Sequence, residues 1–358
     1  MYEQRIETVM KNLEQHGLTQ MLVSDPRSVQ YLTGAYIEPD ERFLGLLLAQ
    51  EHRPVLFMNE LFIIPDKVPC EVQWFTDTDN PVLLLAQQCD AAAPLGCDKR
   101  LAARFLLPLM ECKAASNFVL ASDAVDDARA LKDNAERTAM RAASRTNDAA
   151  MDRFRTLIHE GVTEIEVASQ LEGIYRELGA QGCSFGPIVS FGANAANPHH
   201  EPDNTPLKRG DVVLFDVGCR QDEYCSDMTR TFVFGEASDK QREVHEIIQR
   251  ANAAARALVA PGVHFCELDA AARNVIEEAG YGPYFTHRLG HQIGLDVHEP
   301  GDVSATHNEP VQVGMTFSIE PGIYLPGEFG VRIEDLALVT EDGCEVLNSY
   351  PRELEILG

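Results

Sequence analysis

Acidic residues within the most apolar, strand-like stretches restrict the fold of this 358-residue chain more than any other feature. Asp216 lies inside VVLFDVG, and Asp227 directly precedes MTRTFVFG. A short turn joins the two stretches, which predicts a β-hairpin with one acid on each arm. Burying an ionised carboxylate costs several kcal/mol unless donors or a cation compensate. Arg230 or backbone amides could satisfy either acid alone, but the pair indicates a cation.

Histidines and further acids cluster later in the chain. His287, His291 and His298 share one short stretch of a chain that has 11 histidines. Glu320 and Glu334 each follow apolar, strand-like residues, as the two aspartates do. A single histidine is often a packing residue, so the clustering carries the inference rather than any one member.

Four of these acids and one histidine together form an oxygen-rich set of candidate metal ligands. Its members are Asp216, Asp227, His291, Glu320 and Glu334. The set has enough negative charge for two divalent ions, and Mn²⁺ or Co²⁺ suit it better than a thiolate-type zinc site, with Zn²⁺ as a further alternative. Paired metals about 3.5–4 Å apart activate water and polarise a carbonyl oxygen. The set therefore predicts a hydrolase.

The charge balance excludes other classes of function. The chain has 30 Lys and Arg against 56 Asp and Glu, a net charge of −26. Such a surface repels phosphate backbones and anionic lipids, so we expect neither a nucleic acid nor a membrane as partner. The nine cysteines show no C-x-x-C spacing, and the first residues lack the apolar core of a signal peptide. We therefore expect a cytoplasmic protein.

Patterning predicts an α/β chain of two domains. Residues 2–16 have helical apolar spacing, and short apolar runs interleave with helical segments over the next hundred residues. From residue 123 an Ala-rich, charged stretch predicts a long helix, so we place the domains at 1–125 and 126–358. In the second domain, two helices then strands occur twice, a faint internal repeat.

At these residues the chain resembles the pita-bread metallohydrolases, which include aminopeptidase P, prolidase, creatinase and methionine aminopeptidase. Residues 1–58 also look like the creatinase-type N-terminal domain. The resemblance implies a creatinase-type N-terminal α/β domain followed by a pita-bread catalytic domain with pseudo-two-fold α/β repeats. It covers nearly the whole chain, and the catalytic motifs occur in family order: SFGPIVSFGANAANPHH, GDVVLFDVG, YCSDMTRTF, HRLGHQIGLDVHE, SIEPGIY and VRIEDLALV.

The resemblance also implies a role for each motif residue. The donor set named above would ligate a metal pair, and Glu320 would also carry the proton from the attacking water to the leaving nitrogen. His199 would contact the substrate near the scissile carbonyl, and His298 would stabilise the tetrahedral intermediate. His287 would bind substrate, and Arg332 would orient a bridging acid and line the site. His200 would be a neighbour without a catalytic role.

Three positions depart from the family pattern. Gln292 stands where many relatives have Gly, and Phe185 where some aminopeptidase P enzymes have a Tyr. Asp302 stands where some prolidases have an Arg that clamps the carboxylate of a dipeptide. Because residues 299–319 contain no Lys or Arg, we expect an Xaa-Pro-Xaa tripeptide to be cleaved at least as well as the dipeptide.

The leading hypothesis is therefore an aminopeptidase P-like enzyme that cleaves N-terminal Xaa-Pro bonds of small peptides. One alternative is a metal-dependent hydrolase or lyase of a small modified amino acid, of creatinase, ectoine hydrolase or sulfonium-propionate lyase type. Others are an Xaa-Pro dipeptidase limited to dipeptides, and a binding module, which the intact donor set argues against. Relatives are often dimers, so a homodimer is expected.

Overall fold

The apolar spacing at the start of the chain forms the helix that it predicts. In the computed structural model, which describes residues 1–65 and 67–358, α1 (Tyr2–Gln15) buries Val9 and Leu13. Gly17 follows at φ +70°, a left-handed conformation that glycine adopts without steric strain, and the helix ends there.

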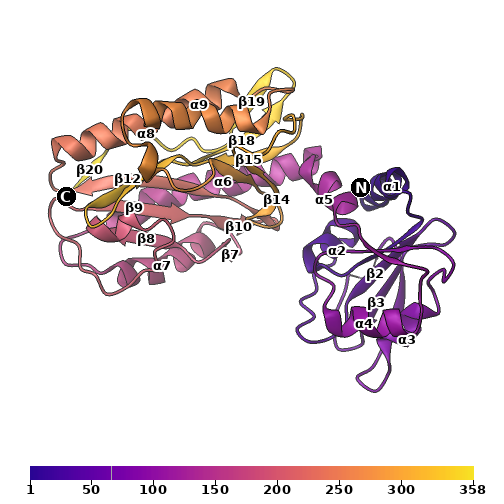
Figure 1. Cartoon of the computed structure of the whole chain (residues 1–358). Helices are drawn as coiled ribbons and strands as arrows, with labels where there is room; N and C mark the ends of the chain where they lie inside the picture. Colours follow the sequence, from indigo (N-terminus) through magenta and orange to yellow (C-terminus); the bar gives the residue numbers. More distant parts are fainter. Residues whose placement is uncertain (66) are drawn as a thin grey trace. The chain divides into compact units, whose positions relative to one another are not determined.

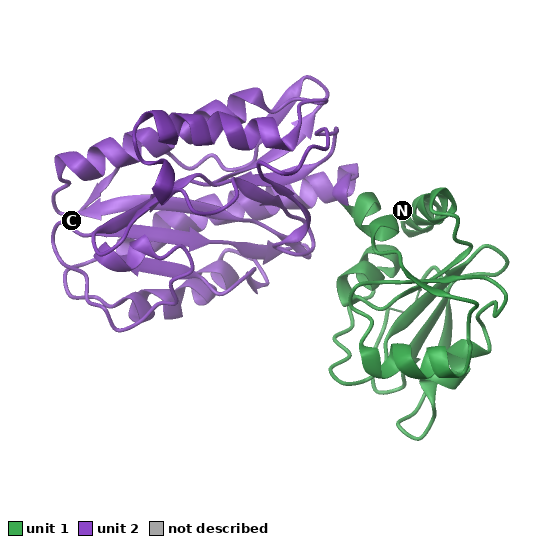
Figure 2. Cartoon of the chain, in the orientation of Figure 1, with its two compact units in different colours: residues 1–129 green, residues 130–358 purple. Residues whose placement is uncertain are grey.

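Two compact units divide the chain, Met1–Arg129 and Ala130–Gly358 (Figure 2). The further elements of the first unit are α2 (Pro26–Thr33), α3 (Pro81–Ala86), α4 (Ala103–Glu111), α5 (Asp123–Ala130), β1 (Gln20–Val23), β2 (Gly45–Ala49), β3 (Val55–Asn59), β4 (Glu71–Phe75), β5 (Leu95–Cys97) and β6 (Phe118–Leu120). Its sheet has the order β4-β3-β2-β1-β5-β6 and mixes parallel with antiparallel pairs. This unit is the α/β domain that the sequence predicts.

The long helix expected from residue 123 is two helices. α5 ends at Ala130, and α6 (Asn134–Phe154) begins after Asp133, whose side chain accepts hydrogen bonds from the N–H groups of Ala135 and Glu136. An aspartate in this position caps a new helix start, so the long helix is confirmed from residue 134 but does not extend back to residue 123. The division proposed from the sequence, after residue 125, falls within α5.

The second unit contains the remaining elements. These are α7 (Glu164–Glu177), α8 (Asp239–Leu258), α9 (Phe265–Glu278), β7 (Gly182–Cys183), β8 (Ile188–Phe191), β9 (Val212–Val217), β10 (Cys219–Gln221), β11 (Tyr224–Cys225), β12 (Met228–Phe234), β13 (Gly290–Gln292), β14 (Glu299–Val303), β15 (Thr316–Ile319), β16 (Gly322–Leu325), β17 (Phe329–Arg332), β18 (Asp335–Thr340), β19 (Gly343–Val346), β20 (Ile356–Leu357) and the 3₁₀ turns η1 (Arg155–Leu157), η2 (Gly192–Ala196) and η3 (Gly282–Tyr284).

One arrangement occurs twice in this unit. α6 and α7 precede a sheet of order β20-β12-β9-β8, and α8 and α9 precede a sheet of order β14-β13-β15-β18-β19. Figure 1 shows α8 and α9 together on one side of the strands and α7 on the other. The internal repeat suggested by the sequence is therefore present in the fold.

Each helix pair shares an apolar core with its own sheet. Met151 and Leu171, from α6 and α7, pack in one buried cluster with Phe215 of β9. Ile248 of α8 packs in a second cluster with Phe317 of β15. An unpaired charge is costly in such a core, and Asp216 lies next to the last residue of β9 rather than in its middle. Within the described ranges, no helix combines the length and apolar character needed to cross a bilayer.

Candidate metal centre

The predicted hairpin is confirmed, and it brings Asp216 and Asp227 to the same end of two strands. β9 pairs antiparallel with β12, and Asp216 lies opposite Thr229, two residues after Asp227. Arg332, not Arg230, binds Asp216, with Nη2 donating to Oδ2 at 2.7 Å. A basic residue thus compensates part of the charge of one aspartate.

His291 on β13 and Glu320 directly after β15 approach the hairpin from the second sheet. Gly290 permits close contact between β13 and β15, because a Cβ at that position would lie 2.0 Å from the carbonyl oxygen of Ser318. The Nε2 atom of His291 lies 3.4 Å from Oε1 of Glu320 and 3.7 Å from Oδ2 of Asp227. The two sheets therefore contribute to one cluster.

Glu334 completes the cluster from the break between β17 and β18. One ligand atom each of Asp227, His291 and Glu334 lies within 4.8 Å of the others, and all three residues are buried. Oδ1 of Asp216, Oδ1 of Asp227 and Oε1 of Glu334 are buried and have no hydrogen-bond partner among the described residues. Buried carboxylate oxygens need a donor or a cation, so this donor set fits divalent ions.

The electrostatics of the cluster agree with that fit. Burial and neighbouring carboxylates raise the pKa values of Asp227 and Glu334 well above the ordinary range. Burial also raises the pKa of Glu320 to about 7 and lowers the pKa of His291 to about 3. Nδ1 of His291 lies 3.2 Å from the carbonyl oxygen of Gln292 and donates to it, which leaves Nε2 with a free lone pair facing the acids.

A cavity of ≈ 560 Å³ opens beside the acids. Every residue that the sequence analysis assigned to metal, catalysis or substrate lines it: Asp216, Asp227, His291, Glu320, Glu334, His199, His298, His287 and Arg332. Phe185 also lines it, together with apolar residues that the sequence analysis missed, Ile188, Pro198 and Val297. The cavity lining thus combines charged and apolar side chains.

Arg332 is held on all sides by the protein. Its Nε donates to Thr229 at 3.0 Å and its Nη1 to the hydroxyl of Tyr324 at 2.8 Å, in addition to the bond with Asp216. The Tyr324 hydroxyl also lies 2.8 Å from Nε2 of His287. Sequence reasoning missed Tyr324, although it closes the SIEPGIY motif. This network gives Arg332 a fixed position beside the acids.

Arg288 is the other arginine of the cavity lining, and the sequence analysis overlooked it. Its side chain is 43% exposed, and Nη1 lies 3.9 Å from Oδ2 of Asp302. Arg273 donates to the carbonyls of Phe285 and His287, which orders the backbone next to it. Arg288 directly follows His287 in the sequence and so lies outside residues 299–319, on which the expectation of a rim without a cation depended.

A buried carboxylate holds the loop that carries His199. Glu164 accepts hydrogen bonds from the N–H groups of Phe191 and Asp203 at 2.7 and 3.1 Å, and Nε2 of His200 lies 2.6 Å from it. Glu164, His200 and Asp203 are close enough to hold an ion, but the Glu164 oxygens already have hydrogen-bond partners. His200 therefore anchors the loop, while His199 lines the cavity.

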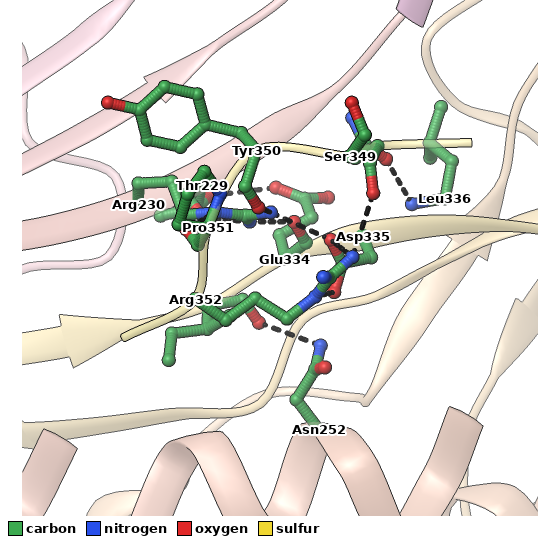
Figure 3. Close-up of polar contacts among 12 residues, drawn as sticks. Thr229, Arg230, Asn252, Glu334, Asp335, Leu336, Ser349, Tyr350, Pro351 and Arg352 are labelled. Carbon is green, nitrogen blue, oxygen red and sulfur yellow. Dashed lines mark hydrogen bonds and ion pairs between the residues drawn. The ribbon is translucent and has the colours of Figure 1, made fainter. Parts of the chain in front are cut away.

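Arg230 belongs to a network of hydrogen bonds and ion pairs that includes Glu334 and Asp335, shown in Figure 3. Nη2 of Arg230 and Nε of Arg352 donate to Asp335 at 2.9 and 2.6 Å, and Nη1 of Arg230 donates to the Glu334 carbonyl at 2.6 Å. Burial alone would raise the pKa of Asp335, but these arginines lower it below its ordinary value. The negative charge of Asp335, next to Glu334 in the chain, is thus neutralised by Arg230 and Arg352.

Comparisons with known proteins agree with this geometry. Residues 138–341 match the model of metallopeptidase family M24, and residues 5–131 match that of the creatinase/prolidase N-terminal domain. An uncharacterized peptidase of Staphylococcus aureus (strain USA300) is 36% identical over 351 residues, which cover 97% of this chain and 99% of that protein.

Solved structures are similar over the same length. The prolidase from Pyrococcus horikoshii OT3 is 32% identical with a TM-score of 0.91, covering 98% of this chain and 99% of that one. The X-Pro aminopeptidase from Thermotoga maritima MSB8 is 29% identical with a TM-score of 0.85, covering 97% and 99%. The two-domain fold expected from the sequence is thereby confirmed.

Proposed function

Because the chain belongs to metallopeptidase family M24, we propose that it hydrolyses the Xaa-Pro bond at the N-terminus of small peptides, using two divalent ions. The buried carboxylate oxygens of Asp216, Asp227 and Glu334 that have no hydrogen-bond partner among the described residues carry this proposal. Asp227 and Glu334 each have a ligand atom within 4.8 Å of one of His291. Glu320 completes the ligand set. Carboxylates with one imidazole suit Mn²⁺, with Co²⁺ or Zn²⁺ as alternatives. The similar prolidase and X-Pro aminopeptidase support the choice of bond.

The residues around the cluster suit this reaction. Bound divalent ions supply a Lewis acid and water activation. His199 and His298 line the cavity next to the acids and donate to the carbonyl oxygen as it becomes negative. Glu320 takes the proton from the attacking water and passes it to the proline nitrogen, which becomes a secondary amine. Ile188 and Val297 offer an apolar surface for the pyrrolidine ring.

Dipeptides are included among the proposed substrates because Arg288 lies at the cavity. The expectation that tripeptides do at least as well as dipeptides depended on a rim without a cation, and Arg288 supplies one. An Xaa-Pro dipeptidase from Bacillus anthracis is also among the similar solved structures, which supports dipeptide substrates. Measuring kcat/KM for an Xaa-Pro dipeptide and its Xaa-Pro-Xaa tripeptide with the same metal compares the two lengths directly.

Asp227→Asn tests the metal centre. We expect the variant to lose bound metal and nearly all Xaa-Pro hydrolysis, because the substitution removes one ligand charge from a buried site. Metal analysis of the purified protein and a dipeptide assay measure both effects. A variant that keeps both ions and full turnover would exclude Asp227 as a ligand.

A further inference from the structure

Buried asparagines hold the backbone beside the proposed ligands. Asn252 on α8 is fully buried, and its Nδ2 donates to the carbonyl oxygens of Ile319 and Ile333 at 3.0 and 3.3 Å. These residues directly precede Glu320 and Glu334. One amide group therefore ties the two glutamate-bearing segments together, and Figure 3 shows it reaching toward the segment of Glu334 and Asp335.

The first half of the unit has the same device. Asn147 on α6 is also fully buried, and its Nδ2 donates to the carbonyl oxygen of Val217 at 2.9 Å. Val217 directly follows Asp216. Asn147 lies 13 residues after the first residue of α6, and Asn252 lies 13 residues after the first residue of α8. The two asparagines thus occupy equivalent places in the internal repeat.

The segment near the C-terminus supplies a third asparagine. Asn348 is 1% exposed, and its Nδ2 donates to the carbonyl oxygen of Asp227 itself at 3.0 Å. Its Oδ1 accepts from the N–H of Leu336, two residues after Glu334, at 2.7 Å. Asn348 therefore ties the hairpin acid to the strand that follows the last glutamate.

The orientation of each amide is determined by its partners. Arg256 donates to Oδ1 of Asn252 at 2.6 Å, and the hydroxyl of Tyr175 donates to Oδ1 of Asn147 at 2.6 Å. Backbone carbonyls only accept, and the Arg256 guanidinium only donates, so the Nδ2 groups must face the carbonyls. A peptide plane fixed in this way also fixes the Cα position of the adjacent acid.

We propose that Asn147, Asn252 and Asn348 are positioning residues that set the spacing of the four carboxylates in the metal centre. This inference rests on the proposed function, because it assumes that those carboxylates bind metal. Metal sites require their ligands to be held within about 0.5 Å of the correct geometry. The carbonyls concerned belong to ligand residues or their chain neighbours, so loosening them displaces the ligands.

Mn²⁺ affinity of the full chain tests the proposal without using activity. We expect Asn252→Ala to raise the Kd for Mn²⁺ by about 10- to 100-fold, the usual effect of removing an outer support of a metal ligand. Isothermal titration of the metal-free protein measures Kd, and the electron paramagnetic resonance spectrum of the Mn²⁺-loaded protein reports the changed geometry. Asn147→Ala should act in the same direction.

Asn59→Ala is the matched control. Asn59 is 1% exposed in the first unit, where it donates to Asp77 at 2.8 Å and accepts from the N–H of Leu61 at 3.0 Å. We expect this control to lower the unfolding midpoint without changing the Mn²⁺ Kd. Should Asn252→Ala not fold, Asn252→Ser retains one donor and can hold one carbonyl, so a smaller rise in Kd is expected.

The outcomes separate the two proposals. Tight Mn²⁺ binding by the wild type, with variants that stay within about two-fold of its Kd, would overturn the positioning role alone. A wild type that binds no Mn²⁺, Co²⁺ or Zn²⁺ would overturn the proposed metal centre and this inference with it. A raised Kd in the Asn252 and Asn147 variants, with Asn59→Ala unchanged, would support both.

Discussion

At the scale of single residues, Arg288 and Arg332 differ in how much of their hydrogen-bonding capacity the protein already uses. Arg332 donates to Thr229, Tyr324 and Asp216, whereas the contact of Arg288 with Asp302 is 3.9 Å long. The guanidinium of Arg288 can therefore donate hydrogen bonds to a substrate carboxylate. We expect Arg288→Ala to raise KM for an Xaa-Pro dipeptide about tenfold, since a charge-assisted hydrogen bond contributes about 1.5–3 kcal/mol and this side chain is partly exposed.

The Xaa-Pro amide is the control substrate, because it lacks the carboxylate and should be nearly unaffected. Arg288→Lys keeps the positive charge but lacks the planar guanidinium, so its KM for the dipeptide should lie between those of the wild type and Arg288→Ala. Steady-state kinetics on both substrates would contradict this role if Arg288→Ala weakened the amide as much as the dipeptide.

At the scale of elements, the first turn of α7 holds the loop after β8 in place through hydrogen bonds. Glu164 binds Phe191, His200 and Asp203, and the loop between them carries His199 to the cavity. We expect His199→Ala to lower kcat roughly 10²–10³-fold and Glu164→Gln about 10- to 100-fold, with metal content unchanged, because a displaced donor stabilises the transition state less well.

A double-mutant cycle checks that the two act together. If Glu164 serves only to place His199, Glu164→Gln should have little further effect on kcat in the His199→Ala background. Independent, additive losses would show that Glu164 acts through another part of the site.

At the scale of the whole molecule, all the proposed ligands lie in the second unit and come from both of its larger sheets and the segments next to them. Ions bound there stabilise that unit by about 2.7 kcal/mol per site at a hundredfold excess over Kd. We therefore expect a chelator to lower its unfolding midpoint by roughly 5–10 °C or more. Trp74, the single tryptophan, belongs to the first unit, so its fluorescence transition should stay in place while the circular dichroism transition shifts. A shift of both signals together would contradict this separation.

Local patterns in the chain were enough to predict most elements and the candidate chemistry of the site. Alternation and helical spacing predict most strands and helices, because burial of one face leaves a periodic pattern in the chain. The unusual acids, such as Asp216 inside an apolar strand, were visible because a buried charge breaks that pattern. The motifs around them identified the family, which the comparisons confirm. Asp133, followed three residues later by Glu136, is a capping signal that marks the start of α6. The Ala-rich sequence on both sides of it nevertheless favoured a single helix.

The polar residues that support the site could be identified only from contacts between distant segments. Nothing in the sequence distinguishes Asn147, Asn252 and Asn348 from ordinary polar residues. Each donates to a backbone carbonyl of a distant segment, and a backbone carbonyl is present at every position, so no residue type marks the partner. The same holds for Glu164, which at the start of a helix reads as a favourable terminal charge. Local patterning records whether a side chain is buried. It does not record which distant segment that side chain meets, since this depends on how the two halves of the second unit pack together.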